Sequence, residues 1–474
     1  MADRAIPSLE KVDPAKAWLP WEPTKDNPWN IQWAGHLYRR AAFGAGLADL
    51  RAAVKRGHPA TIDLLMTGDK DSSSITEDKT EKKKPRGADV YDLRGWWLDV
   101  MLHSPHPFQE KMTLFWHNHF ATSIEKVGRF ELMIEQNQRL REYALGKFGS
   151  LLVEMSRDSA LLFYLDADSN KKDSPNENLA RELLELFTLG VGNYGESDVR
   201  AAALALTGWQ SKGSPALFVE KEHDDSLKKF LGQEGKWHSK DIVRIILKQP
   251  AVSRFLVRKL YSYLVSEAQE PPAALLEPLA ESFRKSDYDT AALAKTILSS
   301  RLFYSVFAYH QRIKSPVEFV LGAIQAVAPN MIDARAQVGR LESMGQQLFA
   351  PPNVKGWPGG RSWLNTGSIL ARHNFAQALS SGSGSINRDI DESRTPPIAI
   401  AVDPAALLRQ DKVTAADEIV SAVAKILLQG ELNNTTRTSL IAFIKDGSPP
   451  ANLLDKCIRD TFHAIMCSPE YQLA

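Results

Sequence analysis

The sequence predicts a mainly α-helical protein: a large multi-helix, bundle-like body with short strand pairs and a C-terminal helical unit. Apolar residues recur at i, i+3 and i+4 through most of the chain, the spacing that gives a helix one buried face. Alternating strand patterns are scarce, and 216–219 and 398–402 are the best short candidates. We therefore expect more than about twelve helices.

Each expected helix is a segment with an apolar face, and several begin with a capping residue. Ser197-Asp198, Ser315-Pro316 and Thr414 are such start signals. In chain order, the expected helices span 31–56, 92–102, 108–120, 130–145, 150–155, 178–189, 197–206, 240–248, 251–265, 273–285, 290–299, 315–327, 334–344, 416–428, 435–444 and 453–466.

Composition divides the chain into parts. Residues 1–30 are an irregular N-terminal arm, with several prolines and no continuous apolar stretch. Residues 31–379 form the main helical domain, and 398–474 supply C-terminal helices that pack on it. The insertion 67–89 and the linker 380–397 contain few apolar side chains, so we expect two mobile surface loops that proteases cut first.

Charge and targeting signals limit the classes of function. The 474 residues contain 58 Lys+Arg and 57 Asp+Glu, so no global field attracts nucleic acid, and we expect no nucleic-acid partner. Residues 1–30 contain acidic groups in place of a secretory signal, and no apolar run reaches the ~18 residues that a membrane span needs. We therefore expect no membrane span and, by default, a cytoplasmic location.

The two cysteines, Cys457 and Cys467, lie in one expected helix. Ten residues at 1.5 Å rise place them ~15 Å apart, too far for a disulfide. We expect neither a disulfide nor a thiolate metal site.

The segment 176–190, NENLARELLELFTLG, is the most informative part of the chain. At 100° per residue its leucines, Ala180 and Phe187 fill one arc of a helix. The other arc carries three carboxylates, an amide and a guanidinium but no lysine, and this composition favours a functional site there. The alternative is an ordinary amphipathic helix with i,i+4 pairs worth ~0.2–0.5 kcal/mol each. The polar arc consists of Glu177, Asn178, Arg181, Glu182, Glu185 and Thr188.

A second segment, 115–120 (FWHNHF), contains two histidines on either side of Asn118. On a helix, His119 falls on the apolar face and His117 points to the opposite side, because i and i+2 side chains diverge by about 200°. Both can serve one site only if the helix unwinds near Trp116, and this spacing is a weak metal signal.

A histidine among apolar neighbours needs a hydrogen-bond partner. We expect segment 115–120 to pack on the Glu-rich helix, with Glu182 or Glu185 as the partner of His119. The alternative is a core histidine that another group satisfies.

The turn 164–170 carries Asp166 and Asn170 and leads to Asn176. It superficially matches a calcium loop, but Lys171 stands where that loop requires glycine, so calcium is disfavoured. We expect these side chains to converge at the helix N-terminus, where backbone N–H groups favour anions.

Two further segments carry polar groups. His223 and Asp224 form a His–carboxylate group in a loop, with a solvated turn as the alternative. In 349–365 (FAPPNVKGWPGGRSWLN), three prolines and three glycines hold two tryptophans beside Lys355 and Arg361. Such a rigid loop suits recognition of planar or sugar-like ligands, and the alternative is that the tryptophans are buried anchors.

Five stretches together resemble one bacterial family: HSPHPFQEKMTLFW, FWHNHFATS, PNENLARELLELFTLG, PPNVKGWPGGRSWLN and SPEYQ. The chain resembles domain of unknown function 1800 from about Ile31 to Ala474. Its members are often exported and often encoded near a sulfatase-like family, so the resemblance implies a sulfatase-like protein partner and an exported location, whereas this chain shows no signal peptide. The family's motif positions fall here on His117, His119, Asn170, Asn176, Glu177, Asn178, Arg181, Glu182, Glu185, Trp357 and Trp363.

These segments lead us to expect a hydrolase of a glycan or related polymer, with a polysaccharide as substrate and no cofactor requirement. Glu177, Glu182, Glu185 and His119 are the expected catalytic residues, because glycoside cleavage needs one protonated and one ionised carboxyl ~5–9.5 Å apart. The expected substrate-binding residues are His117, Asn118, Asp166, Asn170, Asn176, Asn178, Arg181, His223, Asp224, Lys355, Trp357, Arg361 and Trp363.

Two other functions stay open. One is a non-haem metal-binding protein that holds a divalent metal through His and Glu ligands from 115–120 and 176–190, as some helix bundles do. No Glu-x-x-His pair occurs in either segment. The other is a scaffold or partner protein without chemistry, whose polar segments tie helices together.

Overall fold

The protein is mainly α-helical, as its sequence predicts, and it has more than twelve helices. The computed structural model describes residues 7–68, 89–213, 215–327, 334–381, 403–409, 413–430, 432–446 and 454–474. The helices of the first half are α1 Pro14–Ala17, α2 Ile31–Ala41, α3 Leu47–Arg56, α4 His58–Thr67, α6 Val90–His103, α7 Pro107–His119, α8 Ile124–Val127, α9 Phe130–Glu142, α10 Phe148–Met155, α11 Ser159–Tyr164, α12 Asn178–Glu185 and α13 Glu196–Ala205.

The second half continues in the same way. Its helices are α14 Ser239–Leu247, α15 Pro250–Leu264, α16 Ala273–Lys285, α17 Thr290–Leu298, α18 Pro316–Val327, α19 Val338–Ser343, α20 Thr366–Ser381, α21 Ala406–Arg409, α22 Ala416–Leu428, α23 Asn434–Asp446, α24 Leu454–Cys467 and α25 Pro469–Gln472. Short 3-10 turns lie at Leu9–Lys11, Ala167–Ser169, Glu220–Glu222, Arg335–Gln337 and Gly360–Trp363.

Within the described residues, strands occur only as two short antiparallel pairs. The first pairs β1 (Trp209–Gln210) with β2 (Leu217–Phe218), and β2 lies inside the predicted segment 216–219. The second pairs β3 (Lys228–Phe230) with β4 (Gln233–Gly235). Leu231 and Gly232 join them at φ values of 44° and 79°, the positive values that a tight two-residue hairpin turn requires. The predicted strand 398–402 lies outside the described residues.

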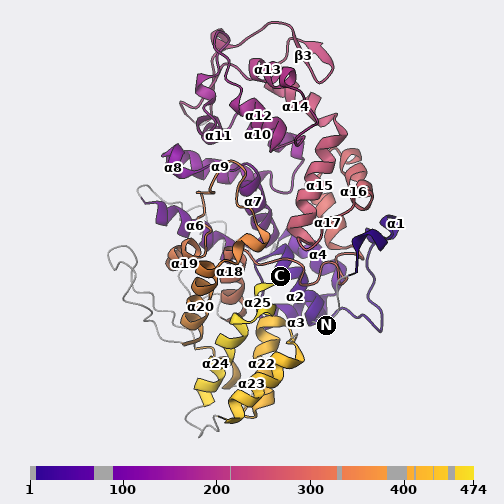
Figure 1. Ribbon diagram of the computed structural model, residues 1–474, viewed down its shortest axis with the longest axis vertical. Helices are drawn as coiled ribbons and strands as arrows, with labels where there is room; N and C mark the ends of the chain where they lie inside the picture. The colour runs from indigo at the N-terminus through magenta and orange to yellow at the C-terminus, as the bar shows by residue number, and fades with distance from the viewer. Residues whose placement is uncertain are drawn as a thin grey trace.

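Two large hydrophobic clusters form most of the core. The first is built from helices that include α7, α10 and α12 to α17, and the second from helices that include α6, α18 to α20, α22 and α24. In Figure 1, α10 to α14 lie at one end of the long axis and α22 to α24 at the other, with α2 and α7 between them. Because α7 contributes Trp116 to the first cluster and Leu114 to the second, this helix lies between the two cores.

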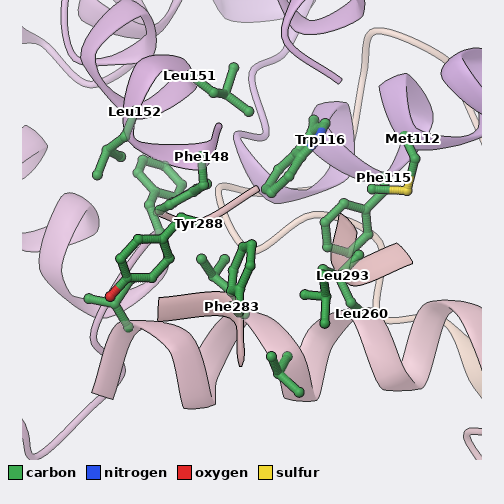
Figure 2. Close-up of a cluster of buried hydrophobic side chains, with 14 of the residues drawn as sticks. Met112, Phe115, Trp116, Phe148, Leu151, Leu152, Leu260, Phe283, Tyr288 and Leu293 are labelled. Carbon is green, nitrogen blue, oxygen red and sulfur yellow. The ribbon is translucent and has the colours of Figure 1, made fainter. Parts of the chain in front are cut away.

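Trp116 is fully buried in the first cluster. Figure 2 shows its ring facing α10, where it stacks on Phe148 with ring centroids 5.6 Å apart. Its indole Nε1 donates a 2.9 Å hydrogen bond to the Ala144 carbonyl. Trp116 therefore fixes α7 against α10 by both packing and a directional bond.

Several boundaries differ from the sequence prediction, and helices α4 and α11 were not predicted. The predicted helix 31–56 is two helices, because the chain breaks at Gly44, whose φ of +99° and close approach to Gly322 no other residue accommodates well. Helix α20 was not predicted, and it contains Ser380, which we placed in the linker. Helix α12 ends at Glu185 rather than 189. Residues 69–88 and 382–397, most of the two predicted mobile loops, lie outside the described residues.

The last helices share the second core with the main body. Helix α24 packs along both α20 and α22. Among the described residues, every helix is too short or too polar to cross a lipid bilayer.

Candidate functional site

The start of α12 is fixed by three asparagines. Asn170 accepts a 2.9 Å hydrogen bond from the Asn176 backbone N–H and donates 2.8 Å to the Ala203 carbonyl on α13. The Asn176 side chain caps the Asn178 N–H at 2.9 Å, and Asn178 donates to the Leu165 carbonyl at 3.2 Å. These amides join the 165–170 turn to the helix.

The acidic groups of this turn also bond within the protein. Asp166 forms a 2.9 Å ion pair with Lys126 of α8. Asp168 accepts from both the N–H and the hydroxyl of Ser211, at 2.5 and 2.6 Å. The turn therefore presents bonded carboxylates, not a set of donors for an anion.

Arg181 directs its guanidinium away from the C-terminal half of α12. It binds both oxygens of Glu196, at 2.7 and 2.9 Å, and one oxygen of Glu177 at 3.0 Å. Arg200 lies 3.6 Å from the other Glu177 oxygen. Glu177 is thus held between two guanidinium groups, and these partly exposed ion pairs contribute little stability.

Glu182 and Glu185 lie one helical turn apart, and both are partly buried. Burial, followed by the negative charge of Glu185, raises the pKa of Glu182 above its ordinary value. The charges of Lys355 and Arg181 act in the opposite direction. Glu185 accepts a 3.2 Å hydrogen bond from the hydroxyl of Tyr194. The two carboxyls therefore have different environments: burial and a neighbouring charge act on Glu182, and a tyrosine hydroxyl binds Glu185.

His119 lies on the other side of the C-terminal end of α12, and its partners differ from our expectation. Its Nε2 bonds to the Phe187 carbonyl at 3.0 Å, and its Nδ1 to the Lys259 amine at 3.0 Å. We expected a carboxylate of Glu182 or Glu185; a backbone carbonyl and a lysine from α15 satisfy both ring nitrogens instead. Segment 115–120 does pack on the end of the Glu-rich segment, with the Phe120 and Phe187 ring centroids 5.0 Å apart.

Lys259 also donates 3.3 Å to the Leu186 carbonyl, at the last turn of α12. Burial lowers the pKa of Lys259 to about 8, and burial together with the Lys259 charge holds the pKa of His119 well below its ordinary value. His119 is therefore a neutral imidazole with Nε2–H as donor and Nδ1 as acceptor. Sequence reasoning missed Lys259 because it lies 140 residues from His119.

His117 occupies an aromatic environment. Its ring centroid lies 5.0 Å from Trp97, 5.4 Å from Phe349 and 5.8 Å from Trp357. Burial lowers its pKa to about 3. Because α7 stays helical to its end, the His117 and His119 side chains lie in different surroundings. Among the described residues, no group with metal-ligand spacing includes either histidine, so the ligand set of the metal-binding alternative is not brought together.

Asn118 binds the loop 349–365, which carries Trp357 and Trp363, to the end of α7. Its Oδ1 accepts 2.6 Å from the Trp357 N–H, and its Nδ2 donates 3.4 Å to the Trp357 carbonyl. Trp357 and Trp363 are only 6% and 7% exposed. Their rings are anchors of the loop, so the stacking surface for a sugar is not exposed, and Lys355 and Arg361 are the exposed charged groups of this loop.

Substituting Gly356 with alanine is expected to loosen the contact of Asn118 with this loop and lower the free energy of unfolding by about 2–3 kcal/mol. Gly356 has a φ of +82°, and an added Cβ would overlap both oxygens of Asn118. The left-handed backbone accounts for about 1–2 kcal/mol and the displaced neighbour for about 1 more. Chemical denaturation measures the change. Gly345→Ala is the control, because Gly345 has a φ of +92° and open space at the Cβ among the described residues; equal losses in both variants would contradict this role of Asn118.

The His223 loop is ordered by its own contacts. The His223 Nδ1 bonds to the Thr207 carbonyl at 3.0 Å, and the Thr207 hydroxyl accepts from the Asp224 N–H at 2.8 Å. Asp224 pairs with the buried Lys228 at 2.9 Å. The loop is therefore a folded element, not a solvated turn, and no contact joins it to Glu182 or Glu185 in the described structure.

A buried ionic cluster at the middle of the molecule has no counterpart in the sequence prediction. Glu318 at the start of α18 binds Lys111 at 2.5 Å and Arg312 at 3.1 Å, and all three side chains are at most 4% exposed. The cavity beside it, lined by Glu318, Lys314 and Tyr471 among others, has a volume of about 20 Å³, room for about one water molecule. The cluster therefore holds helices together and has no space for a sugar.

The comparisons with known proteins identify a family. The model of the family described as "Protein of unknown function (DUF1800)" matches residues 36–473. No curated protein and no solved structure matches the chain. Because the matched span covers nearly the whole sequence, the chain belongs to the DUF1800 family, the one that its motifs resemble.

Proposed function

We propose that this protein is a hydrolase of a glycan or related polymer and that Glu182 and Glu185 are its reacting carboxyls. The observation that carries the proposal is the difference between their environments. Burial and the Glu185 charge raise the pKa of Glu182, while Glu185 accepts the Tyr194 hydrogen bond. Pairs of carboxyls whose environments separate their protonation states are the usual acid and base of glycoside cleavage.

In this proposal Glu182 donates its proton to the oxygen of the leaving sugar as the glycosidic bond breaks. Glu185 either removes a proton from the attacking water or attacks the sugar carbon itself. Side chains at i and i+3 have Cβ atoms about 5–6 Å apart, and side-chain torsions reach the ~5–9.5 Å separations of both mechanisms. The exposed Lys355, whose charge acts on Glu182, would contact the bound polymer.

The other predicted catalytic groups take supporting roles. Glu177 is held by Arg181 and Arg200, so we keep it outside the reacting pair. His119 and Lys259 fix the end of α12, and so position Glu182 and Glu185 through the helix backbone. A sulfatase-like protein partner is part of the proposal only through the family resemblance.

A polysaccharide screen with reducing-sugar detection tests the proposal. We expect the wild type to cleave at least one polymer, and Glu182→Gln and Glu185→Gln to lose that activity. Glu196→Gln is the matched control, because Glu196 is an exposed carboxylate that pairs with the Arg181 guanidinium. Absence of cleavage of every polymer by the wild type, or equal activity in all variants, would refute the hydrolase.

The thermal stability of Glu182→Gln distinguishes a reacting carboxyl at this position from a structural one. Since the folded-state pKa of Glu182 is raised, its ionised form is disfavoured in the fold, and stability falls as pH rises through that pKa. Glu182→Gln is therefore expected to melt at a higher temperature than the wild type at pH 7 and at an equal one at pH 3. A lower melting temperature for the variant at both pH values would mean that Glu182 supports the fold.

A further inference from the structure

Helices α20 and α24 pack side by side and bring three metal-ligand side chains together. His373 lies on α20, and His463 and Cys467 lie on α24. His463 and Cys467 are four residues apart, so they project from the same face of their helix. One nitrogen of each histidine and the Cys467 sulfur lie within 4.8 Å of one another.

The separation of the two imidazoles matches what one ion requires. A metal lies in the plane of each imidazole that binds it, about 2.0–2.1 Å from the ring nitrogen for zinc. Two such rings at a tetrahedral angle have centroids about 5.2 Å apart by this geometry. The His373 and His463 centroids are 5.0 Å apart, and the rings cross at 75°.

One ring nitrogen of this group has no other role. The Nε2 of His463 is a buried atom without a hydrogen-bond partner in the described structure. A buried nitrogen of this kind normally has a partner. His373 is exposed, so its side chain can rotate to close the remaining distance, and Cys467 is a free, partly buried thiol.

We propose that His373, His463 and Cys467 form a binding site for a transition-metal ion of the zinc type. Imidazole and thiolate are ligands that zinc takes readily, and three protein ligands leave the fourth position to water, as in catalytic zinc sites. On binding, the Cys467 thiol loses its proton to solvent as the sulfur–metal bond forms. The sequence led us to expect no thiolate metal site, because we compared the two cysteines with each other and not with the histidines of neighbouring helices.

A second group in the described structure has similar spacing but different geometry. It consists of His223, Asp225 and His238. Its imidazoles are stacked, with centroids 4.2 Å apart and planes only 21° apart, so one ion cannot lie in the plane of both rings. Asp225 also pairs with Lys236 at 3.4 Å. The α20–α24 group is therefore the better site.

Cobalt titration of metal-free, full-length protein tests the site. We expect one Co²⁺ per chain, with the near-ultraviolet charge-transfer band of a cobalt–thiolate bond, and displacement of that band by Zn²⁺. Cys467→Ser is expected to remove the band, and His373→Ala, at an exposed position, to weaken binding without affecting folding. Circular dichroism monitors the fold of each variant.

Two control variants make the result specific. Cys457→Ser removes the other cysteine of α24, and His238→Ala disables the second group; both are expected to keep the band and the stoichiometry. No stoichiometric cobalt binding by the wild type, a band that survives Cys467→Ser, or a band that disappears in Cys457→Ser or His238→Ala would overturn the proposal.

Discussion

Replacement of Glu318 by alanine is expected to lower the free energy of unfolding by about 3–5 kcal/mol, because it removes the carboxylate that pairs with two buried cations. Arg312 keeps a longer pair with Glu267, at 3.9 Å. Lys111 lies 2.5 Å and Arg312 3.1 Å from the Glu318 carboxylate. Glu318 also accepts 2.8 Å from the Ser315 N–H, and so caps the start of α18. Urea denaturation of both proteins at pH 7 measures the loss.

Glu318→Gln separates the charge from the cap, because glutamine can still accept the Ser315 bond. The wild type should also lose this contribution in acid. Burial alone would raise the pKa of Glu318, but Arg312 and Lys111 outweigh it and hold the pKa well below its ordinary value. Stability from a depressed carboxyl pKa is present above the unfolded-state value of ~4.3 and falls as pH drops below it. A loss under ~1 kcal/mol in Glu318→Ala would contradict the assigned role.

Trp116→Ala is expected to destabilise the protein by about 3–5 kcal/mol, the range for removal of a large aromatic side chain from a packed core. The ring is fully buried, and its centroid lies 5.6 Å from Phe148 and 5.4 Å from His119. The substitution also leaves the Ala144 carbonyl without the indole donor. The loss is measured by urea denaturation with circular dichroism.

Trp116→Phe keeps most of the ring and removes the donor, so we expect it to lose less stability than Trp116→Ala. Because Trp116 packs on His119, Trp116→Ala should also loosen the contact of α7 with the end of α12. Faster amide hydrogen exchange at Phe187 to Gly190 would report this change. Equal stability of Trp116→Ala and the wild type would mean that the two cores do not depend on this contact.

Periodicity predicted most helices because their buried faces are apolar, and it failed where they are not. Helix α20 buries Ser368, Arg372 and several alanines, so its sequence lacks an apolar stripe. The break between α2 and α3 depends on the close approach of Gly44 to Gly322, a contact between distant residues. The core positions of α12 were predictable because leucines fill one complete arc.

The sequence predicts which glutamates share one helix, but not which groups they contact. The pattern placed three glutamates on one helix, yet only the fold separates Glu177, held by arginines, from the partly buried Glu182 and Glu185. Tyr194 and Lys259 act across turns and helices, so no local motif contains them. Likewise, a Trp-rich loop has the same composition whether its rings are exposed or buried.

Carbon-13 NMR titration of glutamate-labelled protein is the most direct test of the paired carboxyls. We predict that the Glu182 carboxyl titrates above the ordinary value of ~4.3. In Glu185→Gln its pKa should fall, because the neighbouring negative charge is removed. If Glu182 instead titrates at its ordinary value and does not respond to Glu185→Gln, the two carboxyls do not form an acid–base pair.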